Sequence, residues 1–410
     1  MPNLRWLITE LARRLWVRAS IFAVAGIFTA VIGIALAPLI PAGWSGRIGA
    51  DSVDNVLQIL ASSMLAVTTF SLATMVSAYA TASSATTPRV AELLIQDSSA
   101  QNALGTFVGS FLFSLVGIIA LNAGVYGASG RVVLFVGTIG VIAVIVVTLL
   151  RWIDLLARFG RVGDAIDRVE AAAMQAMRAR WKQPCIGARM RAGPAPTVAA
   201  VTSAKIGYVQ HIDVEALERL AAAAGGEIHV DALPGAFVDT ARPIAWLDFT
   251  PDEATRAAVC AAFNVGARRS FDQDPRFGLI VLSEIASKAL SPAINDPGTA
   301  IATMAALVRV LAILAEPREA ESEIFHPHVF IPALAVEDLF DDAFSPISES
   351  GAGTLAVGIR LQKTLRALSA FHHPEFRAAA RHQSRLALAR ARHALALAED
   401  VARLTHEAVA

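Results

Sequence analysis

Long apolar runs separated by short polar connectors make up the first 150 residues of the chain. An α-helix rises about 1.5 Å per residue, so about 20 mostly apolar residues are needed to cross the hydrocarbon core of a bilayer. Four runs reach this length, at about residues 15–40, 53–80, 106–126 and 132–150. The pattern therefore predicts four transmembrane helices in residues 1–150.

The remaining chain has an ordinary globular composition. Apolar residues at helical spacing predict that the fourth span continues as one helix to Trp181 and ends in a linker, so that helix and linker occupy residues 151–192. Short β-like runs around one helix predict a small α/β module in residues 193–250. Helical periodicity fills residues 251–410 and includes one long final helix at 375–407. We therefore expect a mainly α membrane protein, with four transmembrane helices followed by a cytoplasmic α/β module and a helical domain.

Arginines beside the spans predict the orientation of the chain. Four arginines lie before or at the N-terminal end of the first span, Arg89 lies in the second connector, and four more follow the fourth span, whereas the opposite side carries Arg47 and Arg131. Short cytoplasmic loops are enriched in Lys and Arg, so we expect both termini in the cytoplasm. The apolar run at residues 19–40 is longer than that of a cleaved signal peptide, which predicts an uncleaved anchor.

Composition supports the assignment to the membrane. Hydrophobic residues make up 55% of the chain and charged residues 17%, which is too apolar for an ordinary soluble domain. The formal net charge is zero and the sequence gathers its basic residues into no single run, so we do not expect nucleic acid as a partner. The lipid bilayer is the expected partner.

The second span carries a regular series of hydroxyl side chains. Their spacing of 3, 3, 4 and 3 residues predicts one stripe along a helix. The candidate pore-lining residues are this stripe and the arginine that follows it: Ser71, Thr74, Ser77, Thr81, Ser84 and Arg89. A water-lined pathway explains the stripe, and so does packing against another helix through hydroxyl groups. Arg89 is either a snorkelling residue at a helix end or part of a ring at the cytoplasmic mouth of an oligomeric pore.

No Asp, Glu, Lys, Arg or His occurs between Asn55 and Pro88. Ionisable groups inside a membrane are costly and mark proton relays, voltage sensors and coupling-ion sites. Their absence from the second span argues against a proton-coupled pump and a voltage sensor. A passive pathway and an anchor without transport both stay open.

A second group of polar residues lies between residues 268 and 299. Asp296 stands before Pro297 as a helix N-cap would, and Glu284 and Lys288 are spaced as an i, i+4 pair. Such residues either hold a small ligand at a helix N-terminus or cap and connect a helical hairpin. The candidate residues for a cytoplasmic ligand or interface site are Arg269, Gln273, Asp274, Glu284, Lys288, Ser291, Asn295 and Asp296.

We predict no metal site, no cofactor and no catalytic residue. Prolines interrupt the His326-Pro-His328 sequence and follow His373, which prevents the helical i, i+4 spacing of zinc ligands. The chain contains no nucleophile elbow, Walker loop, dinucleotide fingerprint or HExxH motif, so nothing in it points to an enzyme.

Three sequence blocks resemble a bacterial family of predicted membrane proteins, domain of unknown function 2254. They are the run at 83–89, the residues from Arg269 to Gly278, and the run Ala-Leu-Ser-Pro-Ala-Ile-Asn-Asp-Pro at 289–297. The chain differs from the family at Ala85 and Thr86, where an amide and an aromatic residue are usual, and at Ala293, where glycine is typical. The resemblance implies four spans, a cytoplasmic C-terminal domain and an inner-membrane location, and it assigns no activity.

Two functions fit these patterns best, and an enzyme that uses Glu284, Asp274 or Asp296 is a third, less favoured alternative. One is a homo-oligomeric channel or passive transport protein, in which several copies of the hydroxyl stripe face one another and pass ions or another small solute. The alternative is a membrane-anchored sensor or scaffold that binds a small cytoplasmic ligand and transports nothing.

Overall fold

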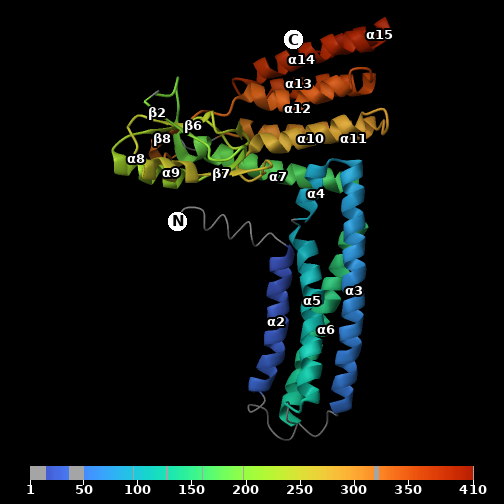
Figure 1. Cartoon of the computed structure of the whole chain (residues 1–410). Coiled ribbons are helices and arrows are strands. Elements are labelled where there is room, and N and C mark those ends of the chain that lie inside the picture. Colours follow the sequence, from blue (N-terminus) through green and yellow to red (C-terminus); the bar gives the residue numbers. More distant parts are fainter. Residues whose placement is uncertain are drawn as a thin grey trace. The chain divides into compact units, whose positions relative to one another are not determined.

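The structure is a computed structural model that describes residues 15–36, 50–95, 97–125, 128–158, 160–196, 198–317 and 323–409 (Figure 1). These residues form two compact units. The membrane unit contains the described residues up to Asp164 except Ala85–Val90. The C-terminal unit contains Ala85–Val90 and the described residues from Ala165 onward.

The membrane unit is a bundle of long helices. It contains α2 (Leu15–Leu36), α3 (Ala50–Ala85), most of α4 (Pro88–Ile95), α5 (Ser98–Asn122) and α6 (Ala128–Arg158). Figure 1 shows α2, α3, α5 and α6 running lengthwise beside one another. Leu60 and Met64 of α3, Phe107 of α5 and Trp152 of α6 meet in one buried cluster. The predicted mainly helical membrane protein with four spans in its N-terminal half is confirmed.

Four described helices are long and apolar enough to cross a membrane, at Ser52–Ala85, Ser98–Asn122, Gly130–Arg158 and Pro297–Ala315. The first three belong to α3, α5 and α6, and α2 adds 22 residues with no charged residue after Arg18. Pro297–Ala315 belongs to the C-terminal unit, where Met304 and Leu307 are fully buried. A helix buried in a protein core is apolar as well, so the apolar composition of Pro297–Ala315 is explained by its burial in the C-terminal unit.

Small residues allow α2 and α5 to approach closely. A Cβ atom on Gly109 would lie 2.6 Å from the backbone oxygen of Phe22, and one on Gly105 would lie 2.7 Å from the Phe22 ring. Glycines four residues apart commonly line such contacts between membrane helices. Gly105 and Gly109 of α5 therefore serve helix packing.

A helix break separates the fourth span from the rest of the chain. The sequence predicts one helix through Trp181, but α6 ends at Arg158 and α7 (Val162–Lys182) begins after Gly160. Gly160 has a φ of 82°, a left-handed conformation that glycine adopts without steric cost. The prediction of one continuous helix is therefore wrong.

Two small sheets follow α7 and the 3₁₀ turn η3 (Pro184–Gly187). The strands and helices of this region are β1 (Ala188–Met190), β2 (Ala199–Thr202), β3 (Gly207–Ile212), α8 (Val214–Ala224), β4 (Ile228–Val230), β5 (Phe237–Val238), β6 (Pro243–Leu247), α9 (Glu253–Ala261) and β7 (Phe263–Gly266). One sheet has the order β1-β8-β4-β6-β2 and the other β5-β3-β7. Strand β8 (His326–Ile331) lies parallel to both β1 and β4, although it comes from far along the chain.

Helices make up the rest of the C-terminal unit. They are α10 (Pro275–Ala289), α11 (Pro297–Ala312), the 3₁₀ turn η4 (Ile313–Ala315), α12 (Val336–Ser350), α13 (Leu355–Ser369), α14 (Phe376–Ala394) and α15 (Ala398–His406). Figure 1 shows α10 to α14 stacked beside the sheets. The long final helix predicted at 375–407 is instead two helices, because the backbone is extended at Leu395 and Leu397.

One arginine connects two of these helices. Arg276, near the start of α10, donates to Asp338 at 2.6 Å and to Asp342 at 2.6 Å, and both acceptors lie on α12. Phe340 of α12 packs edge-on against Phe376 of α14. These contacts fix α10 within the helical layer, and α10 carries much of the candidate site.

Candidate functional site

The hydroxyl stripe of α3 runs from a packed face of the helix onto an exposed one. Ser71 is 1% exposed, Thr74 is half-buried, and Ser77, Thr81 and Ser84 are exposed. At about 100° per residue, Ser77 lies about 120° around the helix from Ser71. Within one chain, the exposed members of the stripe therefore lie in the C-terminal third of α3.

Most of these hydroxyl groups donate to carbonyl groups of their own helix. Thr74 Oγ1 lies 2.9 Å from Ser71 O, Thr81 Oγ1 lies 3.0 Å from Ser77 O, and Ser84 Oγ lies 2.8 Å from Thr81 O. This is the usual way to satisfy a hydroxyl group in an apolar helix. Since the protons point back to the helix, the oxygen lone pairs of the exposed members remain as outward hydrogen-bond acceptors.

Arg89 lies in the C-terminal unit and forms an ion pair there. Its guanidinium contacts Glu284 Oε1 of α10, and the two side chains are 50% and 29% exposed. An ion pair at this exposure contributes only about 0–1 kcal/mol. Its positive charge is nevertheless compensated within the chain, which weakens the interpretation of Arg89 as part of a ring of unpaired positive charges at the mouth of a pore.

Several buried oxygens close to this pair on α10 have no hydrogen-bond partner among the described residues. They are Glu284 Oε2, Ser283 Oγ and Ser287 Oγ, and Thr87 Oγ1 of the connector is in the same condition. Ser287 is three residues from Glu284 and therefore lies on a neighbouring position of the helix surface, whereas the adjacent Ser283 points away from Glu284. The Arg89–Glu284 contact therefore lies in a polar region where several side-chain oxygens have no hydrogen-bond partner among the described residues.

The residues from Arg269 to Asp274 form a tighter, buried network. Arg269 contacts Asp274 Oδ2 through Nε at 2.8 Å and through Nη2 at 2.7 Å, and the Asp274 side chain is 1% exposed. Asp274 Oδ1 also accepts from the backbone N–H groups of Arg276 and Phe277, which makes it the N-cap of α10. Burial raises the pKa of Asp274, while hydrogen bonds and the charge of Arg269 oppose the rise.

Gln273 connects this network to the smaller sheet. Its Oε1 accepts from the Ile212 N–H at 2.9 Å, and its Nε2 donates to Ile212 O at 3.4 Å. The Gln273 carbonyl accepts from the buried Arg180 of α7 at 3.3 Å, and burial lowers the pKa of Arg180. These contacts join α7, β3 and α10, so Arg269, Gln273 and Asp274 hold the fold of the unit together.

The remaining candidate residues lie at the other end of α10. Asp296 caps α11, since Oδ1 accepts from Thr299 N–H at 3.1 Å and Oδ2 from Thr299 Oγ1 at 2.6 Å. Asn295 has a φ of 50° and its N–H donates to Ser291 O at 2.8 Å. Lys288 is half-buried on α10 and interacts with its surroundings. The structure therefore separates the eight candidates into a buried network at Arg269–Asp274 and a more exposed region from Glu284 to Asp296.

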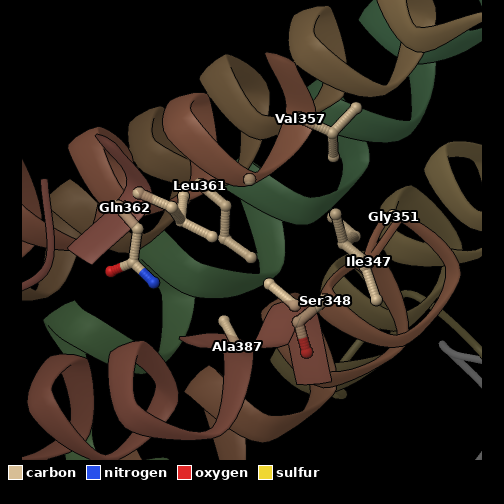
Figure 2. A pocket seen from close by; sticks show the side chains of 11 residues that line it. Ile347, Ser348, Gly351, Val357, Leu361, Gln362 and Ala387 are labelled. Atoms are coloured by element: carbon tan, nitrogen blue, oxygen red, sulfur yellow. The ribbon is translucent and has the colours of Figure 1, made fainter. Parts of the chain in front are cut away.

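A pocket lies among α12, α13, α14 and α15, with an empty volume of about 250 Å³ that includes space open to solvent (Figure 2). Its polar side chains already have partners. Ser384 Oγ donates to Gln362 Oε1 at 2.6 Å, Gln362 Nε2 donates to Ser384 O at 3.1 Å, and Ser348 Oγ donates to Ser345 O at 2.9 Å. We therefore interpret this pocket as a gap in helix packing.

The described residues contain no group of three or more His, Cys, Asp or Glu side chains that could hold a metal ion. Cys185 and Cys260 are both free thiols. His328, which the sequence places beside a proline, pairs with Glu218 at 2.6 Å in a surface contact.

The sequence did not reveal that the connector after the second span belongs to the C-terminal unit. Thr86 is 0% exposed and Thr87 is 6% exposed there, and Arg89 pairs with a helix almost 200 residues further along the chain. A signal was nevertheless present, because Arg89 and Glu284 both lie in or near the blocks that carry the family resemblance. Their opposite charges alone do not predict a contact, because the two residues are 195 positions apart in the chain.

Four apolar helices followed by a unit of helices and small sheets define an integral membrane protein. Residues 12–367 match the family described as Predicted membrane protein (DUF2254), and the chain belongs to that family.

Relatives with curated sequences match a shorter part of the chain. Uncharacterized protein Mb1321c of Mycobacterium bovis and Uncharacterized protein Rv1290c of Mycobacterium tuberculosis are each 33% identical over 115 residues, which are 27% of this chain and 22% of the relative. The chain thus matches about a fifth of the length of these relatives. No solved structure matches the chain.

Proposed function

We propose that the protein is a homo-oligomeric channel or passive transport protein whose path is lined by the C-terminal third of α3. The observation that supports this most is the outward face formed by Ser77, Thr81 and Ser84, which is exposed in one chain and carries no charge. A polar face that is not covered by its own bundle is best satisfied in a membrane by water or by another polar face. Several copies facing one another would supply both.

The chemistry of this face fits passive movement. No Asp, Glu, Lys, Arg or His lies between Asn55 and Pro88, so this part of α3 offers no acidic or basic group for a proton relay or a voltage sensor. The hydroxyl protons of Thr81 and Ser84 are bonded inside the helix, which leaves oxygen acceptors outward. Such a path would pass water, small ions or a small polar solute.

The proposal includes a location and an orientation. The basic residues that flank the spans favour cytoplasmic termini, and the resemblance to a bacterial family supports a location in the inner membrane. The C-terminal unit would then be a cytoplasmic domain.

Solute flux from liposomes containing the purified protein tests the proposal. Thr81→Leu replaces an outward hydroxyl of the stripe with an apolar side chain, and we expect the flux of small ions to fall at least about tenfold, since removing polar ligands raises a barrier by at least 1–2 kcal/mol. Flux is measured by a fluorescent indicator trapped in the liposomes.

Thr69→Leu is the matched control. Thr69 is also exposed on α3 and also donates to its own helix, but it lies about 120° away from Thr81 around the helix axis. We expect it to leave flux unchanged. If wild-type protein passes none of the tested ions or solutes, or if both variants reduce flux equally, the proposed path along Thr81 is wrong.

A membrane-anchored sensor or scaffold is the second candidate. Ser71 is buried in the helix bundle, and the hydroxyl groups of Thr74, Thr81 and Ser84 are satisfied within α3, which is also what a non-conducting anchor needs. Such a protein would bind its small ligand near Glu284 to Asp296. A stable, flux-inactive oligomer whose α3 faces are packed and dry would favour it.

A further inference from the structure

The connector between two membrane helices is built into the C-terminal unit. Residues Ala85–Val90 cluster with the chain from Ala165 onward, although Ser84 before them and Ala91 after them belong to the membrane unit. Thr86 and Val90 are both 0% exposed. The C-terminal end of α3 is therefore attached, through the backbone, to a segment that the C-terminal unit holds.

The side-chain contact of this segment is weaker than two tighter ion pairs of the same unit. Arg309 contacts both oxygens of Glu170, at 2.5 and 2.6 Å, and Arg269 contacts the nearly unexposed Asp274 through two nitrogens. Arg89 contacts a single oxygen of Glu284, and its side chain is half-exposed. Bidentate or buried pairs fix a fold, whereas a single exposed contact exchanges readily with water.

The surroundings of Glu284 also allow an alternative arrangement. Its second oxygen and the hydroxyl oxygens of Ser283 and Ser287 have no partner among the described residues. Ser287 lies one helical turn from Glu284, so a carboxylate released by Arg89 can accept a hydrogen bond from the Ser287 hydroxyl at little cost. The Glu284 carboxylate therefore has two possible arrangements, one paired with Arg89 and one hydrogen-bonded within α10.

We propose that Arg89 and Glu284 form a releasable latch through which the C-terminal unit holds the end of α3. When the latch is closed, α10 restrains the segment Ala85–Val90. When it is open, that segment and the last turns of α3 gain freedom. Because Thr81 and Ser84 lie on those turns, the latch regulates the path along α3; this last step rests on the proposed channel function, whereas the latch itself does not.

Charge reversal and its rescue test the latch in the full chain reconstituted in lipid nanodiscs. Arg89→Glu and Glu284→Arg each place like charges together, and the double variant restores an opposite pair in reversed order. We expect deuterium uptake by residues 81–90 to rise about two- to fivefold in each single variant, a range set by the small energy of an exposed pair, and to return toward wild type in the double variant.

Arg158→Glu is the matched control. Arg158 pairs with Asp154 on α6 and is also well exposed, but this pair lies within one helix of the membrane unit. We expect the change to leave uptake by residues 81–90 unaltered. Equal uptake in the wild type and both single variants, or an increase that the double variant does not reverse, would overturn the latch.

Flux measured on the same proteins separates the two proposals. If uptake follows the expected pattern and flux changes in the single variants and recovers in the double variant, the latch regulates the path. If uptake follows the pattern while no protein conducts, the latch stands and the channel proposal fails. If the wild type conducts and uptake does not respond, the channel stands and the latch fails.

Discussion

At the scale of single residues, carboxylates at helix starts carry much of the local order of the C-terminal unit. Asp213, Asp252, Asp274 and Asp296 each accept a backbone hydrogen bond from the first turn of a helix. The first four N–H groups of a helix have no partner inside it, so such acceptors stabilise the helix end. Asp274 adds an arginine partner, which distinguishes a buried cap from the exposed cap at Asp296.

The exposed N-cap Asp296 leads to a prediction about how stability depends on pH. Hydrogen bonds from Thr299 lower the pKa of Asp296, so its contribution to stability is present above the unfolded pKa and is lost as pH falls through the lower folded pKa. Asp296→Ala should lower stability by about 1 kcal/mol near pH 7. Thermal unfolding of both proteins checks this, and the difference should shrink as the solution is made acid.

The Asp296→Asn variant is the control for charge. Asparagine is a good N-cap residue that does not titrate, so most of the stability near pH 7 should remain and the acid dependence from this site should disappear. An Asp296→Ala difference that stays constant from neutral to strongly acid pH would contradict the assigned cap.

At the scale of elements, glycines decide where helices meet and where they stop. Gly109 allows α5 to approach the backbone of α2, and Gly278 allows α10 to approach α7, where an added Cβ would lie 2.3 Å from Ala173 Cβ. Gly160 ends the helical run that the apolar pattern alone extends past residue 158. Periodicity identifies a helix, but it does not report a backbone break or a close contact.

Gly109→Leu should therefore destabilise the membrane unit. The new side chain would overlap the backbone of Phe22, which cannot move as a side chain can, and overpacking of this kind costs about 1–3 kcal/mol or more. A lower unfolding temperature in detergent is the expected result. Gly140→Leu on α6 is the control, since nothing lies within 4 Å of its added Cβ. Equal losses in both variants would contradict the α2–α5 contact.

At the scale of the whole molecule, sequence order and spatial grouping differ. The C-terminal unit takes Ala85–Val90 from between two membrane helices, and its larger sheet takes β8 from residues 326–331. The polypeptide therefore enters the C-terminal unit before it has completed its membrane helices.

The proposed orientation can be checked with single cysteines in a Cys260→Ser background, in which the remaining Cys185 is buried. Val125 follows α5 and is 51% exposed, and Ala293 lies in the exposed loop before α11. A membrane-impermeant maleimide should label Val125→Cys in intact cells and Ala293→Cys only after the inner membrane is opened, because the basic flanks predict opposite sides for these positions. The reverse labelling would invert the topology.

Much of the architecture followed from the sequence because it depends on local patterns. Apolar runs of sufficient length located the four spans, and the Asp-Pro pair at 296–297 located the start of α11. The hydroxyl stripe of α3 was also readable, since side-chain direction along a helix follows from residue spacing.

Only the tertiary structure decided which residues meet across long separations. Spacing could not show that Ser71 is buried while Thr81 is exposed, that β8 joins β1 and β4, or that Arg89 reaches Glu284. The physical reason is that hydrophobic length and helix periodicity are properties of a continuous segment, whereas burial and ion pairing depend on packing between segments that the sequence keeps far apart.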